Sequence, residues 1–235
     1  MRSKTDLMES PSHGQAGSSS PERRIEEGWQ AAEMLTSPDM LIREQGLDLL
    51  QNSPLPGRAP LIAYLLADRL TDPELSIRRQ SLKILGGLLA EEQQACDPGN
   101  KVIRHLHGAL LQFTREDYLK MLEVSREYLS AEDDLIRVLR LCSFAGRHLS
   151  GIVYDRKTDL ALRQKAIYFA GRVGIMEVRE MLERLVQRVE RIRDQADQQD
   201  RSLPGGYEEL EALYPYAAGA LLRLRTSPKD SGEEG

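Results

Sequence analysis

The side chains that could bind a metal ion or transfer a proton in this chain include four histidines. His105 and His107 are two residues apart in a helical pattern, so they point in different directions and cannot share one metal ion. His13 lies in a polar segment, and His148 ends an expected helix, where a cation would complement the helix dipole. No His-Glu-x-x-His or Cys-x-x-Cys motif occurs, so the sequence predicts no metal site.

Neither of the two cysteines has the surroundings of a nucleophile. Cys142 lies in an apolar helical pattern, so we expect it to be buried and inert. Cys96 precedes Asp97, whose negative charge should raise the pKa of the thiol. Gly205-Gly206 lacks the Lys-Ser/Thr of a phosphate-binding loop. The sequence therefore predicts that the protein is not an enzyme and has no cofactor.

The composition is that of a helical globular protein, with 235 residues, of which 40% are hydrophobic, 29% charged and 5% aromatic. A formal net charge of −5 argues against nucleic-acid binding, which needs a basic surface, although a local basic stripe would still permit it. No apolar run reaches the roughly 18 residues that span a membrane, and no signal peptide is evident. Two scattered cysteines build no disulfide framework, so we expect a cytoplasmic protein without a membrane partner.

Polar residues at both ends predict disordered tails over residues 1–21 and 226–235, with one helical domain over residues 22–225 between them. Clusters of Pro, Gly and Asn separate the helical patterns within this domain. Short loops between helices favour antiparallel neighbours. The predicted helices cover residues 22–36, 38–51, 58–71, 73–94, 100–113, 115–130, 133–150, 157–173, 175–201 and 207–225.

Prolines and small residues indicate where these helices begin and where they approach one another. Ser37-Pro38 and Asp72-Pro73 each offer a capping oxygen followed by a proline, which favours a helix start. Glycine inside a helix costs about 1 kcal/mol relative to alanine, so its repeated use predicts close helix packing. The small residues expected at such contacts are Gly46, Gly86, Gly87, Ala145, Gly146, Ala170 and Gly171.

An internal repeat links two of the predicted helices. Asp-Leu followed by Phe-Ala-Gly-Arg occurs over residues 134–147 and again over residues 159–172, with six identities in fourteen positions. Random alignment at average residue usage would give about one identity. A short repeat of this kind is typical of helical units that cannot bury their apolar face alone and therefore stack.

Residues 72–86, which read Asp-Pro-Glu-Leu-Ser-Ile-Arg-Arg-Gln-Ser-Leu-Lys-Ile-Leu-Gly, resemble the first helix of a HEAT repeat. Residues 159–171 keep the arginine, the small residue and the glycine at the same offsets. Residues 39–46 match the start of the pattern and then lose its final glycine. The copy at residues 134–147 departs from the family, because Val138 occupies the arginine position.

The resemblance implies an all-α fold, namely a right-handed α-solenoid of about five antiparallel HEAT-like helix pairs. In the family, an aspartate and an arginine pair near the turn and set the stacking, so Asp39 would pair with Arg43, and Asp159 with Arg163. Residues 95–133 match least, so they form an insertion or a degenerate unit. The residues expected to have structural roles are Asp39, Arg43, Asp72, Arg78, Gly86, Gly146, Asp159, Arg163 and Gly171.

The same resemblance implies a scaffold or adaptor that binds another protein through its helical surface, without catalysis of its own. In such stacks the second helix of each pair usually lines the concave side. Helices 58–71 and 100–113 would then present the partner-binding surface, whose candidate residues, depending on helix rotation, are Tyr64, Arg69, Arg104 and His107.

Two enzyme-related families have similar repeats. Bilin lyase subunits resemble this chain in the scale of their HEAT-like repeats, so a subunit of such a lyase, or another enzyme-associated HEAT protein, is the alternative function. HEAT-like DNA glycosylases carry aromatic residues in a basic channel. Here the single tryptophan, Trp29, shares a helix face with Ile25 and Ala32, so we expect it to be a packing anchor and disfavour that class.

Apolar residues with heptad spacing run from Val178 to Ala196. One interpretation is an intramolecular seam against neighbouring helices. The alternative is a homodimer formed through this stripe.

Overall fold

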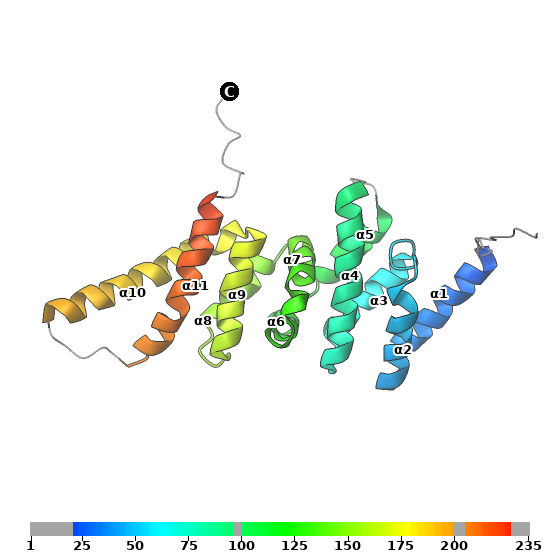
Figure 1. Cartoon of the computed structure of the whole chain (residues 1–235), viewed down its shortest axis with the longest axis horizontal. Coiled ribbons are helices and arrows are strands. Elements are labelled where there is room, and N and C mark those ends of the chain that lie inside the picture. The colour runs from blue at the N-terminus through cyan, green and yellow to red at the C-terminus, as the bar shows by residue number, and fades with distance from the viewer. Residues whose placement is uncertain (1–20, 96–99, 200–204, 227–235) are drawn as a thin grey trace, which may run out of the picture.

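The computed structural model describes residues 21–95, 100–199 and 205–226 (Figure 1). Over these residues the chain forms eleven α-helices and two short 3₁₀ helices, with no strand, so the predicted all-α class is confirmed. Of the predicted tails, Pro21 and Thr226 belong to the first and last helices, and the rest lies outside the described residues. The helices are α1 (Pro21–Leu35), α2 (Met40–Gln51), α3 (Pro60–Arg69), α4 (Leu75–Ala95), α5 (Lys101–Leu110), α6 (Arg115–Glu127), η1 (Leu129–Ala131), α7 (Glu132–Leu141), α8 (Ala145–Tyr154), α9 (Leu160–Val173), η2 (Met176–Val178), α10 (Arg179–Gln199) and α11 (Tyr207–Thr226).

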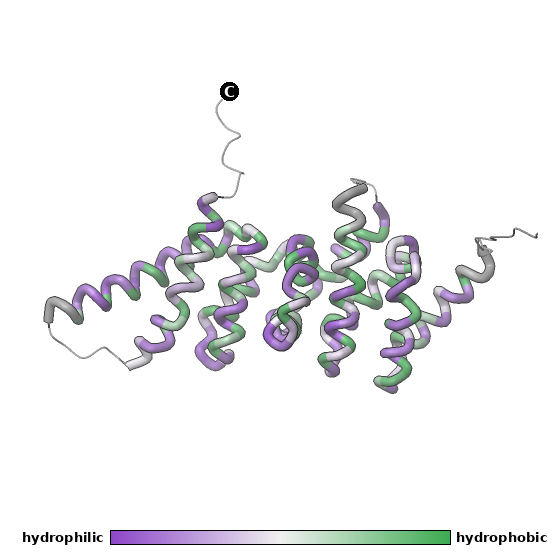
Figure 2. The backbone as a smooth tube through the Cα atoms, viewed as in Figure 1, coloured by the Kyte–Doolittle hydropathy of each residue, from purple (hydrophilic) through white to green (hydrophobic). Residues whose placement is uncertain are grey.

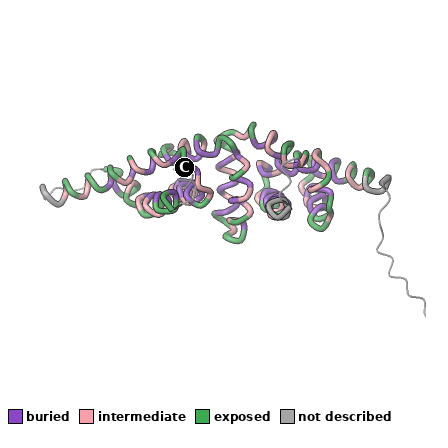
Figure 3. The backbone as a smooth tube through the Cα atoms, turned by 90° about the horizontal axis from the view of Figure 1, so that it is seen from above, coloured by how far each residue is buried: buried purple, intermediate pink, exposed green. Residues whose placement is uncertain are grey.

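Helices that follow one another along the chain also lie near one another in space, as an elongated row (Figure 1). In one layer, α2, α4, α7, α9 and α11 contact each other in that order. In the other, α1 contacts α3, α3 contacts α5, and α6 contacts α8. Buried residues recur along the whole length of the molecule (Figure 3). The apolar core therefore extends from Ala31 to Leu224 instead of gathering around one centre.

The helices combine hydrophobic and hydrophilic residues along their length (Figure 2), because one face packs while another meets solvent. In α4, Ile77, Leu82 and Leu85 are buried, whereas Lys83 is exposed. The helix expected to begin at Pro38 after a Ser37 cap begins instead at Met40, where the Asp39 carboxylate accepts a hydrogen bond of 2.8 Å from the Leu41 amide.

The middle of the molecule departs from the sequence prediction. The helix expected over residues 133–150 is two helices, because α7 ends at Leu141 and Cys142 adopts an extended backbone before α8 begins at Ala145. Residues 142–144 contain neither proline nor glycine, so the usual signal for a helix end is missing. Figure 1 shows α6 and α7 nearly end on between the upright helices α4 and α9.

This break also separates the two copies of the internal repeat. Residues 159–172 form one continuous helix, α9, which Asp159 caps by accepting from the amides of Ala161 and Leu162. Residues 134–147 instead span the end of α7 and the start of α8. The two copies therefore share sequence without sharing local structure, because Asp134 lies inside its helix whereas Asp159 precedes one.

Most of the predicted small-residue contacts are present. A Cβ built on Gly46 would lie 2.9 Å from Met34 Cβ, and one on Gly86 would lie 2.5 Å from Asp134 Cβ. A Cβ on Gly146 would lie 2.8 Å from Glu177 Cβ, and one on Gly171 would lie 2.7 Å from the Ala220 backbone. The prediction for Gly87 was wrong, because nothing lies within 4 Å of its added Cβ.

The heptad stripe lies mainly inside the molecule. Val178, Leu182, Leu185 and Val189 are buried, and α10 packs along α11. Val178 belongs to η2 and therefore precedes α10. Burial of this part of the stripe agrees with the intramolecular seam and leaves little apolar surface for a homodimer at the same place.

Candidate functional site

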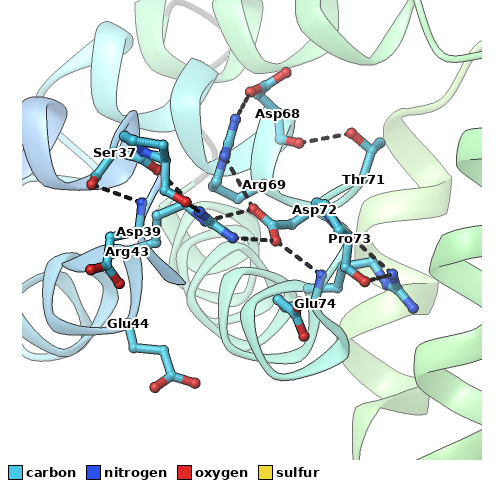
Figure 4. Close-up of polar contacts among 12 residues, drawn as sticks. Ser37, Asp39, Arg43, Glu44, Asp68, Arg69, Thr71, Asp72, Pro73 and Glu74 are labelled. Atoms are coloured by element: carbon cyan, nitrogen blue, oxygen red, sulfur yellow. Dashed lines mark hydrogen bonds and ion pairs between the residues drawn. The ribbon is translucent and has the colours of Figure 1, made fainter. Parts of the chain in front are cut away.

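Helices α2, α3 and α4 meet at one buried carboxylate, that of Asp72 (Figure 4). Arg43 Nη2 donates to Asp72 Oδ1 over 3.1 Å, and Arg69 Nη1 donates to Asp72 Oδ2 over 3.1 Å. The amide of Glu74 donates to Oδ1 over 3.0 Å. Arg43 Nε is 3.0 Å from Oδ2, which is an ion-pair distance, but its N–H does not meet hydrogen-bond geometry. Two guanidinium groups thus neutralise one carboxylate away from solvent.

Arg43 and Arg78 make the same kind of backbone contacts near the starts of α2 and α4. Arg43 Nη1 donates to the carbonyls of Ser37 and Pro38 over 3.0 and 2.9 Å. Arg78 Nη1 donates to the carbonyls of Asp72 and Pro73 over 2.8 and 3.0 Å. Each arginine therefore donates hydrogen bonds to carbonyls of the turn that precedes its own helix. The similar segments around Arg43 and Arg78 therefore share a local structure.

The expected pairing of aspartate with arginine inside one unit is wrong. Asp39 and Asp159 instead cap their helices, because each carboxylate accepts from amides of the first turn. Arg43 reaches forward to Asp72 in the next unit. Arg163 Nε donates to the Val153 carbonyl, and its Nη1 lies 3.1 Å from Glu209 Oε2 on α11.

The four candidate partner-binding residues differ in their surroundings. Tyr64 is exposed on α3, and Arg104 is exposed on α5. His107 Nε2 lies 2.9 Å from the hydroxyl of Ser143, which precedes α8. Arg69 is held by Asp72 and by Asp68. Arg69 thus belongs to the structural cluster around Asp72, whereas Tyr64 lies on α3, a helix that borders a groove.

That groove lies between α1, α3 and the loop before α3, and it has a volume of about 410 Å³. Trp29 is 62% exposed at its edge, so the prediction that it is a packing anchor was wrong. No described element covers the outer side of α1, which leaves Ile25 and Trp29 without a neighbour there. Leu61, one turn before Tyr64 on α3, is a further exposed apolar residue of the groove.

Sequence reasoning did not single out Leu61 or Pro54, which line the groove. Apolar periodicity assigns a residue to a helix face but does not say whether another element covers that face. Trp29 is exposed whereas Ala32, on the same helix, is buried. Only the packing of α1 and α3 in the fold accounts for this difference.

The two groups with the largest pKa shifts, Tyr118 and Cys142, lie in the core and away from this groove. Burial raises the pKa of the Cys142 thiol to about 12, which agrees with the predicted inert cysteine. Burial likewise raises the pKa of Tyr118 far above its usual range. His148 stacks on Tyr118 with ring centroids 4.8 Å apart.

The role expected for His148 at a helix end was wrong, because it lies in the first turn of α8. Burial, followed by the charge of Arg147, lowers the pKa of its imidazole. The ring is therefore a neutral packing group at neutral pH. Cys96, the other cysteine, lies outside the described residues.

Across residues 21–95, 100–199 and 205–226, no three His, Cys, Asp or Glu side chains gather closely enough to hold a metal ion. Nor does any helix in these ranges combine the length and the apolar character needed to cross a bilayer. Comparison with models of protein families, with curated proteins and with solved structures finds no match to this chain.

Proposed function

We propose that this chain is a HEAT-like α-solenoid that acts as a scaffold or adaptor and binds another protein at the groove between α1 and α3. The equivalent contacts of Arg43 and Arg78 and the sequential contacts of the helices support the repeat architecture. No reaction is assigned to the protein itself.

The observation that carries the binding site is the exposure of Trp29 beside an apolar groove. Trp29, Ile25 and Leu61 expose large apolar side chains around one opening of about 410 Å³. Exposed apolar patches of this kind mark interaction sites, and tryptophan is strongly enriched among the residues that dominate binding energy. A partner that covers these three side chains would gain most of its affinity from their burial.

An enzyme or enzyme subunit would need converging polar groups with shifted pKa values in an open pocket. The thiol of Cys142 and the hydroxyl of Tyr118 have strongly raised pKa values, but both side chains are buried in the core. Their surroundings explain the shifts by burial, so they do not favour catalysis.

Affinity purification from the native cell, with protein identification by mass spectrometry, tests the proposal. Trp29→Ser and Leu61→Ser should each deplete the same captured protein at least about tenfold, the loss expected for a residue that dominates an interface. Leu222→Ser is the matched control, because Leu222 is equally exposed on α11 and lies outside the groove. Equal capture by the wild type and both groove variants would overturn the assignment.

Fluorescence offers a second readout, because Trp29 is the single tryptophan of the chain. Its emission in the free protein should be that of a solvent-exposed indole and should be readily quenched by acrylamide. Addition of the purified partner should shift the emission to shorter wavelength and reduce quenching. Emission typical of a buried indole in the free protein would contradict the exposed groove.

A further inference from the structure

A second opening, of about 270 Å³, lies toward the other end of the molecule, between α10, α11, the end of α8 and the first turn of α9. Its inner wall is apolar and is formed by Val153, Leu185 and Leu213, which are buried, and by the partly buried Leu210. A pocket of this size falls just below the roughly 300–1,000 Å³ of typical small-molecule sites. It therefore suits one or two apolar side chains better than a cofactor.

Four arginines surround this apolar wall, and no acidic residue lines the pocket. Arg163 pairs with Glu209, and Arg184 pairs with Glu180. Arg156 and Arg188 are exposed and form no ion pair within the described residues. The pocket is accordingly a local positive site on a chain whose formal net charge is −5.

We propose that this pocket binds an acidic segment of a partner protein, in which an apolar side chain is flanked by carboxylates. The apolar side chain would contact the accessible Tyr154 and Leu210 of the lining, while the carboxylates would meet Arg156 and Arg188. Arginine suits this role because its planar guanidinium binds a carboxylate through two parallel hydrogen bonds. The proposal rests on the proposed function in one respect, namely that the ligand is a protein segment.

The apolar wall favours a peptide over a nucleic acid. A phosphate backbone would use the guanidinium groups but would leave the accessible apolar side chains of Tyr154 and Leu210 without a partner. Nucleic-acid binding also depends on neutralising many phosphates, which the overall negative charge of this chain opposes. An apolar residue flanked by carboxylates would contact both the apolar wall and the arginines of the pocket.

A displayed library of random peptides, selected on the full chain, provides the probe. We expect enrichment of peptides in which a leucine, isoleucine or phenylalanine lies among aspartates and glutamates. A fluorescein-labelled enriched peptide is then measured by fluorescence anisotropy, beside one version with amides in place of the carboxylates and another with serine in place of the apolar residue. Both changed peptides should bind at least about tenfold more weakly.

The protein variants use matched charge reversals. Arg188→Glu, alone and combined with Arg156→Glu, should weaken the enriched peptide by roughly tenfold or more for each arginine, because each loses a charge-assisted hydrogen bond. Arg225→Glu is the control, since Arg225 is exposed on α11 and lies outside the pocket, and it should change affinity less than about twofold.

Several outcomes would overturn this pocket assignment. These are selection without acidic-apolar enrichment, equal binding of the amide version, and unchanged affinity of the Arg156→Glu/Arg188→Glu variant. Self-association that is lost in that variant would reassign the pocket to a second copy of the chain. Thermal unfolding checks that the variants fold, and capture that depends on Trp29 is measured separately, so failure of one site does not imply failure of the other.

Discussion

Arg43 on α2 and Arg163 on α9 each lie four residues after the aspartate that caps their helix, yet their surroundings differ. The carboxylate that pairs with Arg43, that of Asp72, is 0% exposed, whereas the carboxylate that pairs with Arg163, that of Glu209, is 47% exposed. Arg78 lies between these extremes, since its partner Glu123 is 35% exposed. Arg43 thus forms a buried ion pair, whereas Arg163 lies at the edge of an open pocket.

The difference shows that a motif arginine does not by itself specify a structural or a binding role. A buried pair is strongly destabilised when one partner is removed, because the remaining charge stays away from water. A pair with an exposed partner contributes little to stability, since water and salt screen the charges. The burial of the carboxylate that pairs with an arginine therefore determines whether that arginine can bind a ligand without a large loss of stability.

The largest effect is expected from removing the charge of the buried partner. Asp72→Asn should lower the free energy of unfolding by about 3–5 kcal/mol, because it leaves Arg43 buried without a counter-charge. The matched change Glu209→Gln should lower it less, by about 1–2 kcal/mol, because Glu209 is half exposed and the buried Arg163 keeps its hydrogen bond to the Val153 carbonyl. Urea unfolding at neutral pH measures both values. Equal losses of unfolding free energy in the two variants would contradict the difference between the two regions.

Glycine substitutions extend the comparison to helix packing. Gly171→Ala should lower the free energy of unfolding by about 1–3 kcal/mol, because the new Cβ would lie 2.7 Å from the backbone of Ala220. Gly87→Ala should raise it by up to about 1 kcal/mol, since space is open there and alanine favours the helix. Thermal unfolding distinguishes the two signs, and a stable Gly171→Ala variant would show that α9 and α11 are not closely packed.

Glu209 also tests whether the open end is a binding site. Glu209→Gln frees Arg163 from its ion pair, so an acidic peptide should bind more tightly, by up to roughly tenfold. Glu208→Gln removes an exposed neighbouring charge outside the pocket lining and serves as control. Anisotropy titrations at one salt concentration compare the two. Weaker binding by Glu209→Gln would assign that carboxylate to the ligand site instead of to a competing pair.

The smallest effect concerns pH. Burial lowers the pKa of His148 from its ordinary value of 6.5, so between the lowered and ordinary values the unfolded chain binds more protons. The stability linked to the neutral ring is complete above about pH 6.5 and is lost as pH falls through the folded pKa. His148→Phe keeps a ring against Tyr118, so its unfolding free energy should fall less on acidification. Denaturant unfolding at a series of pH values measures this, and identical pH profiles would contradict it.

Local chemistry was enough to predict most helices and the glycines at helix contacts. Gly46 and Gly171 illustrate this, because a small residue permits close approach at one helix crossing. It did not identify the caps Asp39 and Asp159, which were expected to pair with arginines. The break at Cys142 could not be predicted, since no proline or glycine accompanies it and its cause lies in how α8 packs on α6 and α9.

The candidate site could be predicted less well than the helices, because its contacts depend on how distant segments of the chain pack together. The partner of Arg43 is Asp72, which lies 29 residues away, and sequence spacing does not choose between that aspartate and Asp39. Trp29 and Leu61 have ordinary helical spacing, so only the absence of a described element over α1 shows that they are exposed.

Hydrogen–deuterium exchange of the purified protein with and without its captured partner tests the binding groove most directly. Protection is expected in α1 around Trp29 and in the segment from Pro54 to Leu61, which line the groove. Exchange in the half of α4 near Lys83, outside this groove, should stay unchanged. Unchanged exchange around Trp29 and Leu61 in a stable complex would contradict partner binding at this groove.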